Sequence, residues 1–322
     1  MTKLTHDMID PQLRAAGRIT TLMARPNKFG FRFLHWMMER AKGLDIEGTD
    51  SRTVQVTRSD GDGTIRVRVF RPKNTPQPLP IVLYFHGGGY VLGVPEQGNL
   101  LMMYKKLIET RPCVIVAPDY RLSIKYPYPA GLNDCYDTLL WAKHHADEIG
   151  GNINQIFVMG DSAGGGMTAA ISLMARDRGE VKLAFQMPLY PMLDDRPTPT
   201  SAENEMPVWN RKHNQVGWEL YLRGLVAQGA EIPAYAAPAR ATNYAGLPPT
   251  ATFIGALDLF LHETQTYVAN LKAAGIPVQF EVFEGCYHGF EQVVPSADQS
   301  QAAFRFLYDA FAHAVDNHCV VA

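Results

Sequence analysis

The chain has 322 residues, of which 46% are hydrophobic and 19% are charged, and its formal net charge is −2. A chain of this size can bury one large core, whereas its balanced charge gives no basic stripe for nucleic acid and no apolar run is long enough to cross a bilayer. The four cysteines stand at no metal or redox spacing and the opening residues lack the apolar stretch of a secretory signal, so we expect a cytoplasmic compartment and no disulfide framework.

The first 48 residues do not follow the pattern of the rest of the chain. They predict two helices, the first of which starts after Asp10-Pro11. The second is rich in large apolar side chains with basic residues around them, a pattern also typical of an interfacial membrane helix. We favour a cap segment whose aromatic face packs over an apolar pocket, and we expect no membrane contact through residues 1–48. Its candidate substrate contacts are Phe29, Phe31 and Trp36.

From about residue 53 onward, strand-like and helix-like segments alternate. Residues 54–56 and 65–69 alternate polar and apolar side chains around an Asp-Gly turn, which predicts a β-hairpin. Further strands are expected at 81–85, 114–117, 156–159, 183–189, 251–254 and 278–283, and helices near 97–110, 131–148, 163–177, 262–274 and 297–315. This order predicts an α/β fold: a mostly parallel sheet covered by helices on both faces, with the hairpin as an antiparallel N-terminal edge.

Three consecutive glycines follow the predicted strand at 81–85, in the sequence His-Gly-Gly-Gly at 86–89. Glycines leave the backbone N–H groups unshielded, so Gly88 and Gly89 are candidates for donating hydrogen bonds to a developing oxyanion. A flexible turn or a phosphate cradle is the alternative, but the chain has neither a Gly-x-x-x-x-Gly-Lys nor a Gly-x-Gly-x-x-Gly motif to support phosphate binding.

A Gly-x-Ser-x-Gly motif occupies residues 160–164, between an apolar strand-like run and a helix-like run of small residues. This context predicts a nucleophile elbow that holds Ser162 on a strained, exposed turn. The N–H of Ala163, the next residue, is the third candidate oxyanion donor.

Residues 192–247 interrupt the alternation with an irregular, proline-rich stretch. An insertion of this length after a strand is more often functional than passive, so we expect a second cap insertion in a catalytic domain that spans 49–322. Trp209 and Trp218 in this stretch are further candidates for the substrate pocket.

Two residues that could activate the serine follow later strands. Asp258 comes just after the apolar run 251–254, and His288 just after the strand predicted at 278–283. Both should lie at the carboxyl edge of the sheet, as Ser162 does, and the order serine, acid, histidine is the one this topology uses. The other histidines have no acidic or cysteine partners at ligand spacing, so we expect no metal site.

Taken together, these motifs resemble the hormone-sensitive-lipase-like esterases of the α/β-hydrolase fold. The resemblance rests on His-Gly-Gly-Gly at 86–89, Asp-Tyr-Arg-Leu at 119–122, Gly-Asp-Ser-Ala-Gly-Gly at 160–165 and His-Gly-Phe at 288–290, and it spans roughly residues 50 to 315. It implies a serine carboxylesterase with a two-part lid that acts on short acyl esters. Matched motif by motif, it implies Ser162 as nucleophile, Asp258 and His288 as its partners, and Gly88, Gly89 and Ala163 as oxyanion donors.

The chain departs from the family pattern at two places. The family usually has proline after the acid, whereas here Leu259 follows Asp258; this frees the backbone there and makes Glu263 an alternative acid. The family also tends to follow Tyr-Arg-Leu with a Pro-Glu pair, where this chain has Ser123 and Ile124, so any role of that glutamate is in doubt.

We therefore expect hydrolysis of a short carboxylic ester through an acyl-enzyme, without a cofactor. The expected partner is a small-molecule ester and not nucleic acid; a homodimer is left open. An amidase or formamidase would use the same triad. A protein of this fold that only binds a small ligand would be expected to have lost its serine or histidine, and both are present.

Overall fold

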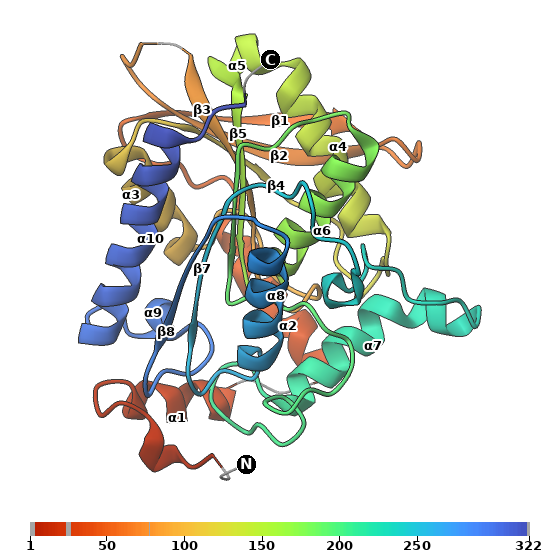
Figure 1. Cartoon of the computed structure of the whole chain (residues 1–322), viewed down its shortest axis with the longest axis vertical. Helices are drawn as coiled ribbons and strands as arrows, with labels where there is room; N and C mark the ends of the chain where they lie inside the picture. Colours follow the sequence, from red (N-terminus) through yellow and green to blue (C-terminus); the bar gives the residue numbers. More distant parts are fainter. Residues whose placement is uncertain (1–3, 24–26, 77, 321–322) are drawn as a thin grey trace.

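The computed structural model describes residues 4–23, 27–76 and 78–320, and these form one eight-stranded sheet (Figure 1). The strand order is β1-β2-β4-β3-β5-β6-β7-β8. The strands are β1 (Thr49–Thr57), β2 (Thr64–Pro72), β3 (Leu79–Phe85), β4 (Val114–Pro118), β5 (Gly151–Asp161), β6 (Phe185–Leu189), β7 (Thr250–Gly255) and β8 (Val278–Phe283). The pairs β1–β2 and β2–β4 are antiparallel and the rest are parallel, which confirms the predicted sheet and its edge hairpin.

Helices cover both faces of the sheet, as its unbroken apolar strands require. In Figure 1, α3 (Gly98–Thr110) and α10 (Asp298–Asn317) lie on one side, and α4 (Ala130–His144), α6 (Ala163–Arg178) and α8 (Leu261–Ala273) lie on the other. The single helix expected near 131–148 is instead two, because the backbone leaves helical geometry at His145 (φ −108°, ψ 21°) before α5 (Ala146–Ile149). The other predicted helices are confirmed to within a few residues.

The N-terminal segment contains η1 (His6–Met8), α1 (Arg14–Met23), α2 (Lys28–Met38) and η2 (Glu39–Ala41). It is held at the carboxyl end of β8, where the Asp10 N–H donates to the Gly285 carbonyl and the Tyr287 hydroxyl donates to the Leu13 carbonyl. Ile9 and Leu13 are buried there. The segment therefore lies at the sheet edge where the functional residues were expected.

The stretch 192–247 forms α7 (Arg211–Ala227) and η3 (Pro238–Arg240), joined by irregular backbone. Asn210 caps α7, because its side-chain oxygen accepts from the N–H groups of Lys212 and His213. The buried face of α7 recurs at helical spacing, from His213 through Gly217 to Tyr221. This face lies against the loop that follows β3, since a Cβ on Gly217 would be 3.2 Å from the Gly89 carbonyl oxygen.

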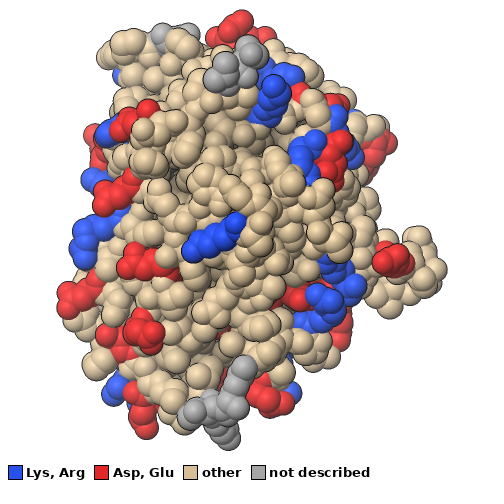
Figure 2. Space-filling view, viewed as in Figure 1, with Lys and Arg blue, Asp and Glu red and all other residues tan. Residues whose placement is uncertain are grey.

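On the face shown in Figure 2, acidic and basic side chains are interspersed and neither sign forms an extended patch. Among the described residues, no helix has both the length and the apolar character needed to span a bilayer.

Candidate active site

Ser162 stands alone between β5, which ends at Asp161, and α6, which starts at Ala163. Its backbone has φ 56° and ψ −118°, a conformation that a residue with a side chain adopts only when its surroundings enforce it. The glycines on either side enforce it by close approach. A Cβ on Gly160 would lie 2.4 Å from the Gly164 carbonyl oxygen, and a Cβ on Gly164 would lie 1.9 Å from the Phe85 carbonyl oxygen.

Three side chains from three turns meet at this point. His288 Nε2 lies 2.8 Å from Ser162 Oγ, and His288 Nδ1 lies 2.8 Å from Asp258 Oδ2. All three residues are at least 95% buried. A carboxylate can accept a hydrogen bond but cannot donate one, so its contact with Nδ1 keeps the imidazole proton on Nδ1. Nε2 is then free to take the proton of the serine hydroxyl. The arrangement can therefore activate Ser162 as a nucleophile.

The imidazole is also held by two aromatic rings that the sequence did not point to. Tyr190 lies edge-on to His288 with ring centroids 5.2 Å apart, and Phe260 does so at 5.1 Å. Their interplanar angles of 84° and 86° leave the imidazole little room to rotate. Tyr190 follows β6 and Phe260 follows Asp258, so the residues that hold the imidazole also come from the carboxyl ends of strands.

The loop after Asp258 is stabilised without the proline that the family usually has there. Asp258 Oδ1 accepts from the Phe260 N–H at 2.9 Å, and the Thr200 hydroxyl donates to the Leu259 carbonyl at 2.8 Å. Glu263, the alternative acid, accepts instead from the backbone N–H groups of Leu193 and Asp194. Of the two acids, Asp258 is the one that contacts the imidazole, and Glu263 fixes the start of the 192–247 stretch.

The glycine loop after β3 has the backbone geometry of a donor loop. Gly88 and Gly89 have φ of +112° and +60°, and neither amide donates a hydrogen bond elsewhere in the described chain. A Cβ on Gly88 would lie 2.1 Å from the Leu92 carbonyl oxygen. Ala163 opens α6, so its N–H has no partner within the helix. These three amides are thus free to point at a negatively charged ligand atom.

Two buried side chains anchor this loop, and only the structure reveals their roles. Asp161 accepts from the Gly87 N–H at 3.1 Å and from the Tyr84 hydroxyl at 2.9 Å. The His86 ring stacks on Tyr120 at 4.3 Å, and the Tyr120 hydroxyl donates to the His86 carbonyl at 2.7 Å. Asp161 precedes Ser162 and His86 precedes the glycines, so both anchors of the loop are neighbours of candidate site residues.

His86 gives a testable pH dependence of stability. Burial lowers its pKa to about 4, whereas an unfolded histidine has a pKa of about 6.5. Between these values the unfolded chain binds a proton that the folded chain does not, so the free energy of unfolding falls as the pH falls from about 6.5 towards about 4. We expect His86→Phe to lose less stability than the wild type between about pH 7 and about pH 5 in urea unfolding. Parallel losses in the two proteins would contradict this.

Three of the five candidate substrate contacts lie beside the glycine loop. The Trp209 ring packs on Gly89, since a Cβ there would lie 2.1 Å from its Cη2 atom. Phe31 stacks on Trp209 at 5.8 Å, and Trp218 lies 5.5 Å from Tyr90. Phe31, Trp209 and Trp218 are therefore buried next to the candidate oxyanion donors.

The structure corrects the prediction for the remaining two candidates, which were expected on an aromatic face over the pocket. Phe29 is 82% exposed and Trp36 is 53% exposed; Trp36 lies under the guanidinium of Arg40 at 3.8 Å. At 100° per residue, positions 29, 33 and 36 share one side of α2, and Phe31 lies on the other. Among the described residues, the buried side of α2 is the one with Phe31, so Phe29 and Trp36 do not cover the region beside the glycine loop.

The face of α7 near these rings carries polar groups that the sequence analysis missed. His213 Nδ1 must donate to Asn210 Oδ1 at 2.8 Å, because that oxygen already accepts from two backbone N–H groups. His213 Nε2 is then an acceptor, and it is buried without a partner, as is Trp209 Nε1. Burial also lowers the pKa of His213 to about 4. Within the described residues, no cluster of three or more His, Cys, Asp or Glu side chains could hold a metal ion.

Comparison with known proteins places this geometry in a family. The family described as alpha/beta hydrolase fold matches residues 82–292, which include Ser162, Asp258 and His288. Carboxylesterase NlhH of Mycobacterium tuberculosis is 34% identical over 249 residues, covering 75% of this chain and 76% of the relative. Esterase LipI of the same organism is 32% identical over 256 residues, covering 77% and 79%.

Solved structures of other esterases also superpose on this chain. A bacterial heroin esterase superposes with a TM-score of 0.85 and 31% identity, covering 97% of this chain and 99% of the other. Esterase LipW of Mycobacterium marinum superposes with a TM-score of 0.84 and 28% identity, covering 97% and 98%. The likeness therefore extends over nearly the whole chain, including the N-terminal segment.

Proposed function

Because this chain belongs to the hormone-sensitive-lipase-like family of the α/β-hydrolase fold and is a carboxylic ester hydrolase, we propose that it cleaves short acyl esters with Ser162 as nucleophile, His288 as base and Asp258 as orienting acid. The observation that carries this proposal is the pair of 2.8 Å contacts through the His288 imidazole. They connect a buried carboxylate to a hydroxyl on a strained turn.

The reaction follows from these positions. His288 Nε2 takes the Ser162 proton while Oγ forms a bond to the acyl carbon, and the carbonyl oxygen becomes an oxyanion. The N–H groups of Gly88, Gly89 and Ala163 stabilise that charge. His288 then gives the proton to the leaving alcohol as the ester C–O bond breaks, and an acyl-enzyme remains. Water repeats the sequence, releases the carboxylic acid and restores Ser162.

Two features of the site support a short acyl chain. The rings of Phe31 and Trp209 cover one side of the glycine loop. The rings of Trp218 and Tyr221 pack on Tyr90, the residue after Gly89, with centroids 5.5 and 4.1 Å away. Buried rings on two sides of the loop leave little space for a long alkyl chain. The side chains around the loop therefore favour a small acyl group.

We expect kcat/KM on p-nitrophenyl esters to rise at short acyl lengths and then to fall. Each methylene that fits should add about 0.8 kcal/mol of binding, or roughly fourfold, until the pocket is filled. The measurement is initial rate at neutral pH across the series from acetate to palmitate, with the Ser162→Ala protein as the blank.

Undiminished rates on long-chain emulsions would instead point to a lipase with an open cap. No turnover of any ester, combined with hydrolysis of formamides or other amides in the same assay, would overturn the ester assignment and favour an amidase. Both results are read against the same blank.

A further inference from the structure

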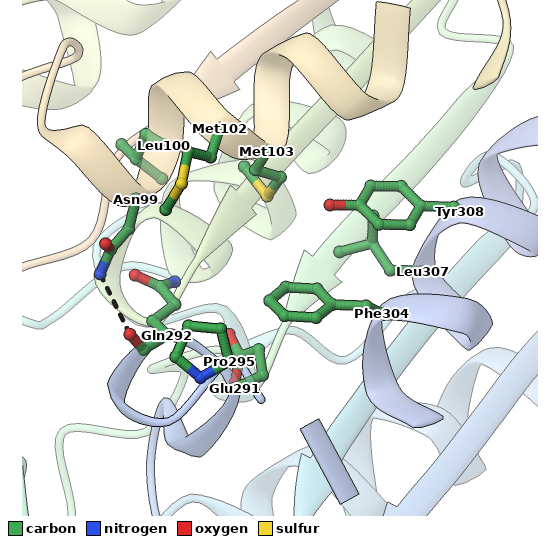
Figure 3. Close-up of a pocket in the computed structure, with 10 residues that line it drawn as sticks. All are labelled: Asn99, Leu100, Met102, Met103, Glu291, Gln292, Pro295, Phe304, Leu307 and Tyr308. Atoms are coloured by element: carbon green, nitrogen blue, oxygen red, sulfur yellow. Dashed lines mark hydrogen bonds between the residues drawn. The ribbon is translucent and has the colours of Figure 1, made fainter. Parts of the chain in front are cut away.

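One side of α2 exposes a group of large apolar side chains. Their exposed fractions run from 44% to 82%, and the residues are Phe29, Phe33, Trp36 and Met37. At 100° per residue they lie within an arc of about 100°, so they form one surface, which we call the outer face. The other large apolar side chains exposed in the described chain each lie on a different element or loop. Met102 of α3, for example, lines a hollow between α3, α9 (Phe290–Val293) and α10 (Figure 3).

The described chain leaves the outer face uncovered. Phe33 and Trp36 contact each other, with ring centroids 5.9 Å apart. The sequence favoured an aromatic face over the pocket and, for that reason, no membrane contact through residues 1–48. Of the Phe and Trp side chains of α2, however, only Phe31 is buried, so that reason no longer holds. An exposed apolar patch with polar residues at its rim is typical of a surface that binds a protein or a membrane.

Basic residues surround the outer face, and α2 itself contains no acidic residue. The cations are Lys28, Arg32 and Arg40, and all three are exposed. Within the described chain none of them forms an ion pair. Arg40 instead places its guanidinium 3.8 Å from the centre of the Trp36 ring, and the nearby acid Glu39 pairs with Lys42 at 3.2 Å. The rim of the outer face is therefore positively charged and free to meet an anion.

An anionic membrane surface fits both properties of the outer face. Large apolar side chains with Lys and Arg beside them are typical of a helix that lies in the membrane interface, and tryptophan is enriched at the headgroup level. With 11 residues, α2 is about half as long as a helix that spans a bilayer, so it would lie on the surface. A second copy of the chain fits less well. A two-fold contact would place the outer face against itself and bring unpaired cations of like charge together.

We propose that the outer face of α2 docks on membranes that contain anionic lipid, with its aromatic rings among the headgroups and its three cations on lipid phosphates. The docking does not depend on Ser162 or on the proposed function. It does bring the candidate active site close to the lipid, because Phe31, on the opposite side of α2, stacks on Trp209 next to Gly89. A helix is only about 10 Å across, so an ester dissolved in the membrane would lie near the glycine loop.

The test is co-sedimentation of the full-length protein at about pH 7 with two kinds of lipid vesicle. One kind contains phosphatidylcholine alone, and the other contains equal parts of phosphatidylcholine and phosphatidylglycerol. Each cation near an anionic surface adds roughly fivefold to binding, so we expect at least about tenfold tighter binding to the mixed vesicles, weakened by added salt. No binding, or equal binding to both kinds of vesicle, would overturn the proposal.

Two double variants locate the contact on α2. Phe29→Ser/Phe33→Ser should weaken binding to the mixed vesicles by about thirtyfold or more, because two large apolar groups no longer leave water. Lys28→Gln/Arg32→Gln should weaken it by about twentyfold, because two cations are lost. All four side chains are exposed, so the melting temperatures should stay close to that of the wild type.

Ile153→Ser and Lys182→Gln are the matched controls. Both residues are exposed and lie near the amino ends of strands, Ile153 in β5 and Lys182 before β6, at the edge of the sheet opposite to α2. Each should bind the mixed vesicles as the wild type does. Equal binding by the α2 variants and the controls would place the contact elsewhere and contradict the proposal. A dimer in light scattering that Phe29→Ser/Phe33→Ser converts into a monomer, without vesicle binding by the wild type, would assign the outer face to a second copy and also overturn it.

Discussion

Replacing Ser162 with alanine is expected to lower kcat on p-nitrophenyl butyrate by about 10⁶, because loss of a triad serine costs about as much as loss of the whole triad. Alanine has no oxygen to form the acyl-enzyme, so only binding and the glycine-loop amides remain to accelerate attack by water. The fold should persist, since alanine occupies the same backbone conformation with no larger side chain. We expect the free energy of unfolding to change by no more than about 1 kcal/mol.

Ser172→Ala is the matched control for this substitution. Ser172 is a buried serine on α6, the helix that begins just after Ser162, and its hydroxyl donates to the Thr168 carbonyl at 2.8 Å, away from His288. Its removal should leave kcat within about twofold of the wild type, because it touches no group of the site. Comparable activity in Ser162→Ala and Ser172→Ala would mean that Ser162 is not the nucleophile.

Much of the fold could be predicted because its strands are either unbroken apolar runs or strictly alternating ones. The hairpin is an example: its alternation and its Asp-Gly turn at 60–63 fix both the strands and the register Thr57 to Thr64 that the structure shows. Ser162, Asp258 and His288 could be brought together for a similar reason, since the carboxyl ends of parallel strands meet at one edge.

The residues that orient the site could not be predicted in this way. A hydrogen bond joins Tyr190 to Glu291, which lie 101 positions apart in the sequence, and another joins Gly87 to Asp161, 74 positions apart. Neither contact has a local pattern, because each depends on how distant turns pack once the sheet is formed. The prediction that Phe29 and Trp36 face the pocket is wrong for a different reason. The aromatic composition of α2 predicts a single aromatic face, whereas helical periodicity places Phe31 on the opposite side from Phe29 and Trp36.

The second large effect is expected from Asp258→Asn, which should lower kcat by about 10⁴, as in other triads of this chemistry. The introduced side chain could still accept from the Phe260 N–H through its amide oxygen, so the loop should keep its shape. Its NH₂ group would then face His288 Nδ1 and donate to it. That reverses the tautomer, places the proton on Nε2, and leaves no acceptor for the Ser162 hydroxyl.

Glu263→Gln distinguishes the two acids within the same assay. A glutamine oxygen can still accept from the N–H of Leu193, so kcat should stay within about twofold while Asp258→Asn loses about 10⁴. The opposite pattern, with less than about tenfold loss at Asp258 and a large loss at Glu263, would assign the orienting role to Glu263. A large loss of kcat in both variants, with unchanged melting temperatures, would mean that both acids are needed to orient the imidazole. The two acids together would then hold the 258–263 turn that a proline holds in the family.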